Sequence, residues 1–398
     1  MKYFCFLIIL YYSLPCVGKI FPPLLPQPQK IVYTHEKLIL DQIYLENTEN
    51  LQEWWAWLHE TNTTVISIPA PKTIKINILP QLPEIPLNSQ EGYKIKITNN
   101  QIHVSATSST GTYRALQTIR QLTCKDKDIY YLPTCEITDW PAFRIRGFMH
   151  DVGRTYISLK ELKKEIELLS RFKINVFHWH LTENQAWRLE SKLYPELNSP
   201  QNMTRMPGKY YTLQEAKELV KFCKEHHVML IPEIDMPGHS EAFNRAFHAD
   251  MQSQKGMEIL KKLMDEICET FDVPYIHIGT DEVKFTNPEF VPEMVRYVRS
   301  KGKKVISWNP GWNYQPGEID MTQLWSYRGK AQPGIPAIDC RFHYLNHFDT
   351  YADLVALYNS RIYNCGQGSE DIAGSILAIW NDLSLIHISE PTRHSLIS

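Results

Sequence analysis

The second part of the chain repeats a short apolar strand followed by a polar or amphipathic segment. Beyond Pro141 the strand candidates are, in order, FRIRGFMHD, INVFHWHL, VMLIPEID, YIHIGTDEV, KKVISWN, TQLWSY, AIDCRFHY and SILAIWND. Amphipathic helices are expected between them, and the first opens with a capping box from Ser158 to Glu161. Alternating strands and helices are typical of a parallel sheet, and eight strands predict a (β/α)8 TIM barrel. An open doubly wound sheet is the alternative, but the sequence has no glycine-rich phosphate loop after the first strand.

A different pattern precedes Pro141 and predicts a smaller domain. TIKIN, GYKIKIT and QIHVSA alternate apolar and polar residues, as strands with one buried face do, and GTYRALQTIRQL is expected to form a helix. We therefore predict a small α+β domain over residues 20–139 and the barrel over residues 140–383. A chain of 398 residues, 43% hydrophobic, is long enough for both cores.

Several features are typical of the secretory pathway. Residues 1–18 have the apolar run and small-residue end of a signal peptide, and the run is too short to span a membrane comfortably. Sequons at Asn62 and Asn202 agree with a secreted or lysosomal glycoprotein. In an oxidising compartment, neighbouring cysteines are candidate disulfides, although other pairings remain open. The candidate pairs are Cys124 with Cys135, Cys223 with Cys268, and Cys340 with Cys365.

The C-terminal stretch differs from the rest of the chain. SLIHISEPTR resembles a translated sequencing adapter, so residues 384–398 are interpreted as a non-native tail. On this interpretation the barrel is truncated at its C-terminus, because its last strand lacks the helix that should cover it.

Polar side chains gather where the strand candidates end. In a parallel barrel these ends converge at one mouth, where chemistry takes place. The clearest cluster is HIGTDEV, residues 277–283, in which Asp281 and Glu282 follow an apolar strand. Two close carboxylates raise the pKa of at least one of them, and a carboxylic acid protonated near neutral pH can serve as a general acid. Taken alone, the pair could also be an ordinary solvated Asp-Glu loop.

HIGTDEV is similar to the His-x-Gly-Gly-Asp-Glu signature of glycoside hydrolase family 20, the β-N-acetylhexosaminidases, and other blocks match in the same order. RGFMHDVGRTY resembles the family's Arg-Gly-x-x-x-Asp-x-x-Arg block, HWHLTENQAWR its second-strand block and PEIDMPGH its third-strand block. The resemblance spans residues 22–383. It implies a retaining glycosidase, without metal or other cofactor, that removes terminal non-reducing N-acetyl-D-hexosamine.

The resemblance also assigns roles to individual residues. Glu282 would be the general acid/base and Asp281 would orient the substrate's acetamido group, whose oxygen attacks the anomeric carbon to give an oxazolinium intermediate. Because adjacent side chains on a strand diverge, the two cannot easily act as acid and nucleophile on one bond. The substrate-binding set is Arg146, Trp308, Trp325, Tyr344, Asn346, Trp380 and Asp382, and the supporting set is His239, Glu183 and Asp151.

Within these sets the expected contacts are specific. Tyr344 would bond the acetamido carbonyl, the tryptophans would wall the sugar pocket, and Arg146 would fork onto sugar hydroxyls. An ion pair with Asp151 is the alternative for Arg146, and Arg154 is interpreted as structural. His239 would support the acid/base pocket together with the acidic residue at position 183.

The chain departs from the family pattern at four positions. Glu183 stands where an aspartate is usual, which moves the carboxylate by about 1.5 Å. Thr280 replaces the second glycine, Asn346 an aspartate and Asp382 a glutamate. None of these changes removes the carboxylate pair.

Two other functions remain open. His178 and His180 on one strand could begin the metal site of an amidohydrolase-type barrel, although their match to the second-strand block favours a structural role. A catalytically silent carbohydrate-binding homologue is the non-enzyme alternative. The expected partners are N-acetylhexosamine-terminated glycans or chitin oligosaccharides, with a homodimer left open. The net charge of −2, with dispersed basic residues, argues against nucleic acid and anionic membranes.

Overall fold

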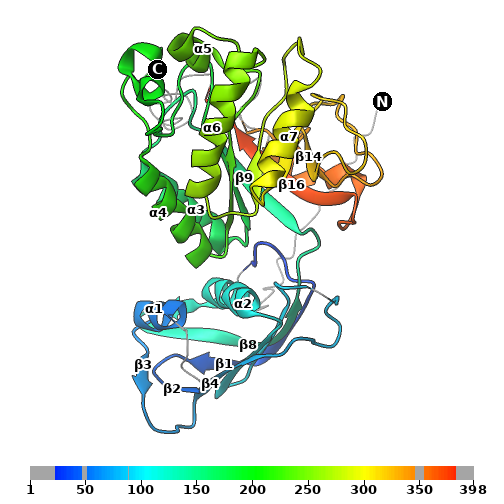
Figure 1. Ribbon diagram of the computed structural model, residues 1–398. Helices are drawn as coiled ribbons and strands as arrows, with labels where there is room; N and C mark the ends of the chain where they lie inside the picture. Colours follow the sequence, from blue (N-terminus) through cyan, green and yellow to red (C-terminus); the bar gives the residue numbers. More distant parts are fainter. Residues whose placement is uncertain (1–22, 47–51, 88, 346–353, 382–398) are drawn as a thin grey trace, which may run out of the picture. The chain divides into compact units, whose positions relative to one another are not determined.

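The computed structural model describes residues 23–46, 52–87, 89–345 and 354–381 (Figure 1). The chain divides into two compact units, Met1–Trp140 and Pro141–Ser398. The predicted signal peptide, the predicted non-native tail, Asn346 and Asp382 lie outside the described residues.

The N-terminal unit is a mixed sheet with helices α1 (Gln52–Glu60) and α2 (Ser109–Leu122). Its strands follow the order β1-β8-β5-β6-β4-β2-β3, and β7 pairs with β8. Alternate residues such as Ile95, Ile102 and Val104 are buried under the helices, as the period-two pattern predicts. The strands are β1 (Lys30–Ile39), β2 (Gln42–Glu46), β3 (Thr64–Ile66), β4 (Thr73–Ile78), β5 (Tyr93–Ile97), β6 (Gln101–Ala106), β7 (Cys124–Asp126) and β8 (Ile129–Asp139).

The second unit contains a closed barrel in the order β10-β11-β12-β13-β14-β15-β16-β9, with every neighbouring pair parallel. Each of the eight expected segments coincides with a strand, although β14 and β16 begin one and three residues before the expected segments, so the predicted fold class is confirmed. They are β9 (Ile145–Asp151), β10 (Val176–His180), β11 (Met229–Glu233), β12 (Tyr275–His277), β13 (Lys304–Asn309), β14 (Met321–Leu324), β15 (Ala337–Asp339) and β16 (Ile372–Ile379).

The second unit has six described α-helices. They are α3 (Leu159–Arg171), α4 (Leu213–Glu225), α5 (Glu241–Phe247), α6 (Gln254–Thr270), α7 (Phe290–Ser300) and α8 (Leu354–Asn359), with short 3₁₀ turns at Pro195–Asn198, Pro200–Asn202 and Ile362–Asn364. Of these, α3, α4, α6 and α7 lie beside the barrel strands in Figure 1. The predicted capping box at Ser158 is present, and a second opens α4 at Thr212.

The regular alternation of strand and helix fails in two places. Among the described residues, the connections from β13 to β14 and from β14 to β15 contain no helix. Both segments, NPGWNYQPGEID and WSYRGKAQPGIP, are rich in proline and glycine, which disfavour helix interiors. They lie on the mouth side of the barrel as irregular loops.

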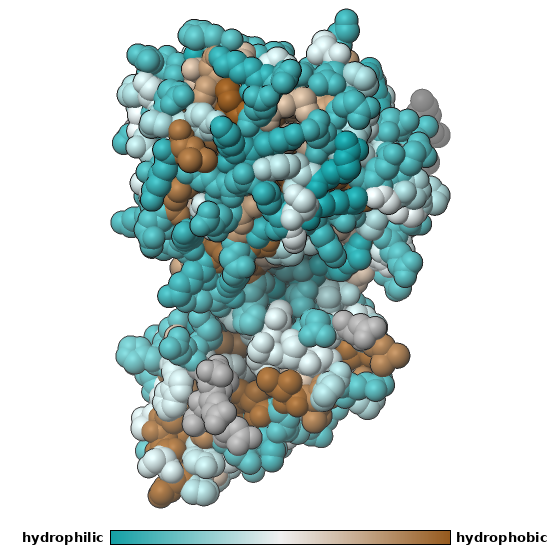
Figure 2. Space-filling model, viewed as in Figure 1, coloured by the Kyte–Doolittle hydropathy of each residue, from teal (hydrophilic) through white to brown (hydrophobic). Residues whose placement is uncertain are grey.

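The barrel interior is packed rather than hollow. Met149, Ile231, Ile306, Trp308 and Ile376 form its apolar cluster, and a second cluster fills the space between strands and helices. Hydrophilic residues dominate the face of this unit shown in Figure 2. A filled interior leaves the strand ends as the place where a site can form.

The structure forms none of the predicted disulfides, because the six cysteines among the described residues are free. Cys124 pairs in register with Tyr131, which is four residues, roughly 13 Å, along β8 from Cys135. A disulfide requires Cα atoms less than about 7 Å apart. Cys340 belongs to the barrel interior cluster, whereas Cys365 follows a 3₁₀ turn.

Two further observations concern the predicted passage through the secretory pathway. Asn62 is exposed after α1, whereas the side chain of Asn202 is buried and donates to the carbonyl of Glu196 at 2.8 Å. Among the described residues, no helix is both long and apolar enough to cross a bilayer.

Candidate active site

The backbone after β12 separates the two adjacent carboxylates. Thr280 and Glu282 have φ values of 86° and 48°, in the left-handed region that non-glycine residues rarely adopt. Asp281 is 7% exposed, whereas the side chain of Glu282 is 56% exposed. Asp281 therefore points into the mouth of the barrel while Glu282 reaches solvent above it.

Asp281 is an acid poised near neutral pH. Burial raises its pKa to about 6 against the opposing charge of His239. Its Oδ1 is buried and has no hydrogen-bond partner among the described residues. A buried acceptor without a donor is costly, so this oxygen is suited to accept an N–H from a bound ligand.

His239 connects three carboxylates. Its Nδ1 lies 2.6 Å from Glu183 Oε1, and its Nε2 lies 3.5 Å from Glu282 Oε2 and 3.8 Å from Asp281 Oδ2. Burial alone would lower the pKa of His239, but the hydrogen bond to Glu183 and the neighbouring carboxylates Asp235 and Asp281 raise it to about 10. The imidazole is therefore a cation that faces both residues of the carboxylate pair.

Glu183 fills the position where the family pattern has an aspartate. Its side chain is 1% exposed, and the same Oε1 that contacts His239 lies 2.5 Å from Arg154 Nη2. Burial would raise its pKa, but these two cations hold the pKa below its usual value. The longer side chain thus still reaches the histidine that the shorter one was expected to contact.

Arg146 does not lie at the mouth, and its predicted contact with the sugar is wrong. It is the second residue of β9, whose C-terminal end is Asp151. Its Nε and Nη2 donate to the carbonyl of Lys173 at 3.0 and 2.8 Å, and its Nη1 donates to the carbonyl of Phe143 at 2.8 Å. These contacts hold the guanidinium at the opposite end of the barrel from Glu282.

Arg154 occupies the mouth instead, although the sequence was interpreted as giving it a structural role. Its Nη1 lies 2.9 Å from Asp151 Oδ2, and its guanidinium carbon lies 5.1 Å from the centre of the Trp380 ring. Burial would raise the pKa of Asp151, but Arg154 and His180 lower it. The position of Arg154, three residues beyond the end of β9, was the signal that could have identified it.

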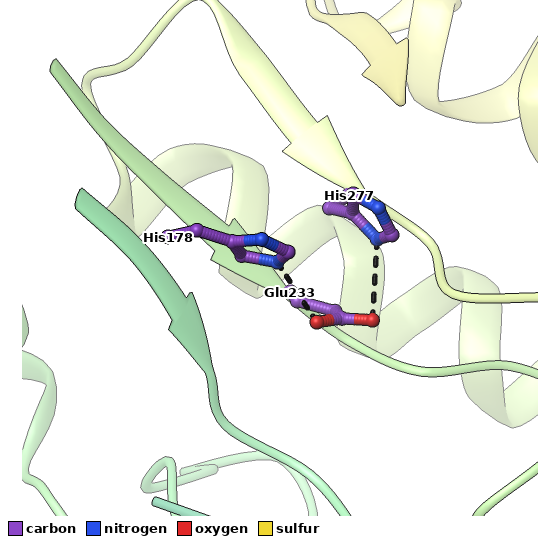
Figure 3. Close-up of side chains that lie close together, drawn as sticks. All are labelled: His178, Glu233 and His277. Carbon is purple, nitrogen blue, oxygen red and sulfur yellow. Dashed lines mark ion pairs between the residues drawn. The ribbon is translucent and has the colours of Figure 1, made fainter. Parts of the chain in front are cut away.

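A buried cluster of nitrogen donors around one carboxylate lies beneath the mouth (Figure 3). Glu233, at the end of β11, is fully buried, and its oxygens lie 2.8 Å from His178 Nε2 and 3.2 Å from His277 Nδ1. His180 Nδ1 is 2.6 Å away, and Trp308 Nε1 donates to Oε1 at 2.6 Å. Glu233 was not among the predicted site residues, because a single carboxylate within an apolar strand forms no recognisable motif with its neighbours in the sequence.

These four donors also set the charge of the cluster. Burial would raise the pKa of Glu233, but the histidines hold it well below its usual value. Burial would lower the pKa of His180, but Glu233 and Asp151 raise it to about 9. For His178 the effect of burial dominates and lowers the pKa to about 4. The Glu233 carboxylate therefore faces a charged His180 and a neutral His178.

Within the described part of the chain, three groups of side chains have donor atoms close enough for a metal ion. They are His178 with Glu233 and His277, His180 with Glu233 and Asp235, and Asp235 with His239 and Asp281. In the first two groups the shared carboxylate already faces the imidazole and indole donors, and every residue is buried. A catalytic metal needs an open coordination position for water or substrate. The arrangement therefore favours the structural role of His178 and His180 over an amidohydrolase-type site.

The predicted aromatic wall is divided into two parts. Trp308 is fully buried and packs 5.8 Å, centre to centre, behind Trp380, so it supports the wall without being exposed in it. Trp380 and Tyr344 are half-buried, with ring centres 6.2 Å apart. Trp325 Nε1 donates to the carbonyl of Pro310 at 2.7 Å, and Trp325 and Tyr344 line a cavity of about 570 Å³.

Comparisons with known proteins agree with this geometry. The family model "Glycosyl hydrolase family 20, domain 2" matches residues 22–140, and "Glycosyl hydrolase family 20, catalytic domain" matches residues 143–255. Together these segments cover more than half of the chain. The matched catalytic segment includes Asp151, Glu183 and His239, whereas Asp281 and Glu282 follow it in the sequence.

Individual relatives point to the same family. The chain is 33% identical over 227 residues to a β-hexosaminidase of Porphyromonas gingivalis, and the match covers 48% of this chain and 29% of the relative. It is 36% identical over 231 residues to a β-hexosaminidase of Akkermansia muciniphila, and the match covers 50% of this chain and 46% of the relative. The chain spans about half or less of the length of these curated relatives. The crystal structure of β-N-acetylhexosaminidase from Bacteroides fragilis aligns with a TM-score of 0.76 at 27% identity, covering 90% of this chain and 85% of that one. Because both domains match family models in order and the barrel places an acidic pair at its mouth, the chain belongs to glycosyl hydrolase family 20.

Proposed function

We propose that the chain is a β-N-acetylhexosaminidase that hydrolyses terminal non-reducing N-acetyl-D-hexosamine with retention, through an oxazolinium intermediate. The observation that carries the proposal is the position of His239 between buried Glu183 and the pair Asp281 and Glu282. This arrangement provides an acid reachable from solvent and a buried acceptor beside it. The names of the relatives agree with this activity.

In this proposal Asp281 uses its unpartnered Oδ1 to accept the acetamido N–H. The negative charge of Asp281 makes the acetamido oxygen a better nucleophile toward the anomeric carbon, and it stabilises the positive charge that forms. Tyr344 would donate to the same acetamido oxygen. Its pKa is raised by burial and by the nearby Asp281, which keeps its hydroxyl protonated.

Glu282 would protonate the glycosidic oxygen as the bond breaks, and would then remove a proton from the water that opens the oxazolinium ion. His239 lies 3.5 Å from it and carries a positive charge in the resting site. In this position His239 would orient the Glu282 carboxyl group toward the glycosidic oxygen.

The hydroxyl end of the terminal sugar would bind at Arg154, in the role first expected of Arg146. Arg154 lies against the Trp380 ring, and an arginine fork can donate to two neighbouring hydroxyls. Trp380 would cover the apolar face of the sugar. Sugar binding at this mouth would also cover the buried acceptor of Asp281 and exclude water from it.

The direct test is release of p-nitrophenol from the N-acetyl-β-glucosaminide by the parent chain and by Glu282→Gln. Loss of a general acid typically costs about a hundredfold to ten-thousandfold in kcat/KM. Glu289→Gln is the matched control, because it neutralises an exposed glutamate, paired only loosely with Arg296, in the following segment. A folded parent that binds N-acetylglucosamine without cleaving the glycoside would instead support the silent carbohydrate-binding homologue.

We further propose that the chain is secreted or lysosomal and glycosylated at Asn62, which is exposed. Expression in eukaryotic cells followed by digestion with an N-glycosidase should lower the apparent mass of the parent but not that of Asn62→Gln. An unchanged mass in both would contradict the glycosylation. The homodimer remains a prediction that light scattering can check.

A further inference from the structure

A second binding surface adjoins the candidate active site. The cavity of about 570 Å³ is formed by the loops after β13, β14 and β15, at the same end of the barrel as Glu282. Its volume is within the usual range for ligand pockets. It is lined by Pro310, Trp325, Ser326, Tyr327, Arg328, Arg341, Phe342 and Tyr344.

Two aromatic rings of this cavity face solvent. Tyr327 is 72% exposed and Phe342 is 61% exposed, although both are large and could have been buried. Exposed rings at a pocket rim offer flat apolar surfaces on which a sugar ring can pack. Trp325 and Tyr344 line the same cavity and also belong to the candidate active site.

The charge of the cavity is positive. Its charged side chains are Arg328 and Arg341, and Arg341 is bound at both ends of its fork by Asp339, at 2.8 and 3.1 Å. Arg328 is exposed and donates from Nε to the hydroxyl of Tyr327 at 3.3 Å. Among the described residues no carboxylate lies within ion-pair distance of Arg328, so one guanidinium is available to an anionic ligand.

The orientation of the terminal sugar decides which part of a glycan would reach this cavity. The centre of the Trp380 ring lies 5.1 Å from the guanidinium carbon of Arg154 and 6.2 Å from the centre of the Tyr344 ring. In the proposed function the free hydroxyls lie at Arg154 and the acetamido group lies at Tyr344. Because the ring carbon that carries the acetamido group is bonded to the anomeric carbon, the scissile bond would leave the site on the Tyr344 side, where the cavity begins.

We propose that this cavity binds the second sugar of the substrate and favours an acidic sugar there, with Arg328 binding its carboxylate or sulfate. The inference rests on the proposed function for the direction of the glycan. It extends that function by naming the substrate class: glycans in which a terminal N-acetylhexosamine is linked to an acidic sugar.

The test compares two disaccharides with the same terminal N-acetylglucosamine and the same linkage, one ending in glucuronic acid and one in N-acetylglucosamine. The parent should cleave the acidic disaccharide with a kcat/KM roughly two- to fivefold higher, as one exposed ion pair allows. Arg328→Gln should lower kcat/KM for the acidic disaccharide and bring this ratio close to one. The preference of the parent should also shrink as salt is added, because salt screens an exposed pair.

Lys330→Gln is the matched control, since it removes an exposed positive charge two residues away that does not line the cavity. Phe342→Ala should weaken both disaccharides and leave N-acetylglucosamine itself unchanged. A sulfated second sugar in place of glucuronic acid distinguishes a carboxylate site from a general anion site.

The failure of this inference can be told from the failure of the proposed function. Binding of both disaccharides to Glu282→Gln, measured by tryptophan fluorescence, reports on the cavity without turnover. Equal dissociation constants for the two, or an Arg328→Gln variant that keeps the parent's preference, would overturn the acidic-sugar site. A parent that binds the acidic disaccharide more tightly but cleaves neither would refute only the hexosaminidase proposal.

Discussion

Replacing Glu183 with glutamine tests whether a buried carboxylate keeps His239 charged. The change preserves the size of the side chain but removes the negative charge 2.6 Å from His239 Nδ1. The hydrogen bond to Glu183 is the largest of the contributions that raise the pKa of His239 to about 10. We expect Glu183→Gln to return this pKa to near its ordinary value of about 6.5.

The magnitude follows from proton linkage. Because the folded pKa of His239 is raised, its contribution to stability is fully present below about pH 6.5 and is lost as the pH rises toward 10. In that window the free energy of unfolding of the parent should fall by about 1.4 kcal/mol per pH unit from this group. Glu183→Gln should therefore cost about 3 to 5 kcal/mol at pH 6, the range for breaking a buried pair, and about 3 kcal/mol less than that at pH 9.

Urea unfolding at several pH values, together with kcat for the aryl glycoside, measures both consequences. Glu165→Gln is the matched control, because it removes the carboxylate 2.8 Å from His150 Nδ1, in a pair between β9 and α3 that does not include His239. This control should keep the parent's activity. A Glu183→Gln variant whose stability loss is the same at pH 6 and pH 9, with kcat unchanged, would refute the account of a charged His239.

Three further outcomes are expected. The kcat/KM of the parent should rise as the pH passes about 6, where Asp281 ionises. Asp281→Asn should lower kcat at least about a hundredfold and should remove this rise from the pH profile. A variant with the parent's pH profile would count against the role of Asp281. Arg154→Lys should raise KM about tenfold, whereas Arg146→Lys should lower the melting temperature and leave KM unchanged. The reverse pattern would support Arg146, as predicted from the sequence, as the residue that binds the sugar hydroxyls. Gly279→Ala should lower the free energy of unfolding by more than about 2 kcal/mol, measured by thermal unfolding. The φ of Gly279 is +66°, and a Cβ at this position would lie 1.7 Å from Asp235 Oδ1. A variant as stable as the parent would contradict the described turn.

The barrel could be predicted because its strands are short apolar runs with a strict order along the chain. Each of the eight expected segments contains a strand, and the helix that begins after Ser158 has the predicted cap. The loops after β13 and β14 could not be predicted in detail. Their proline and glycine residues exclude a helix but do not specify one irregular conformation.

The candidate site was predicted best where a side chain follows a strand end. Asp281, Glu282 and His239 meet this condition, and the structure brings them together. Arg146 does not, because it lies at the start of β9, and parallel strands turn only their C-terminal ends toward the mouth. Applied strictly, this rule would have selected Arg154 from the same sequence block.

The division of labour between the two adjacent carboxylates depends on the backbone rather than on residue type. Extended residues send alternate side chains to opposite faces, but β12 ends at His277, and the next residues turn through left-handed conformations. The turn leaves Asp281 beneath the mouth, where burial raises its pKa, and Glu282 above it, where it can exchange protons with solvent. Left-handed conformations at Thr280 and Glu282 cost on the order of 1 to 3 kcal/mol each. The packed strands beneath therefore hold the acidic pair in a geometry that the local sequence alone would not adopt.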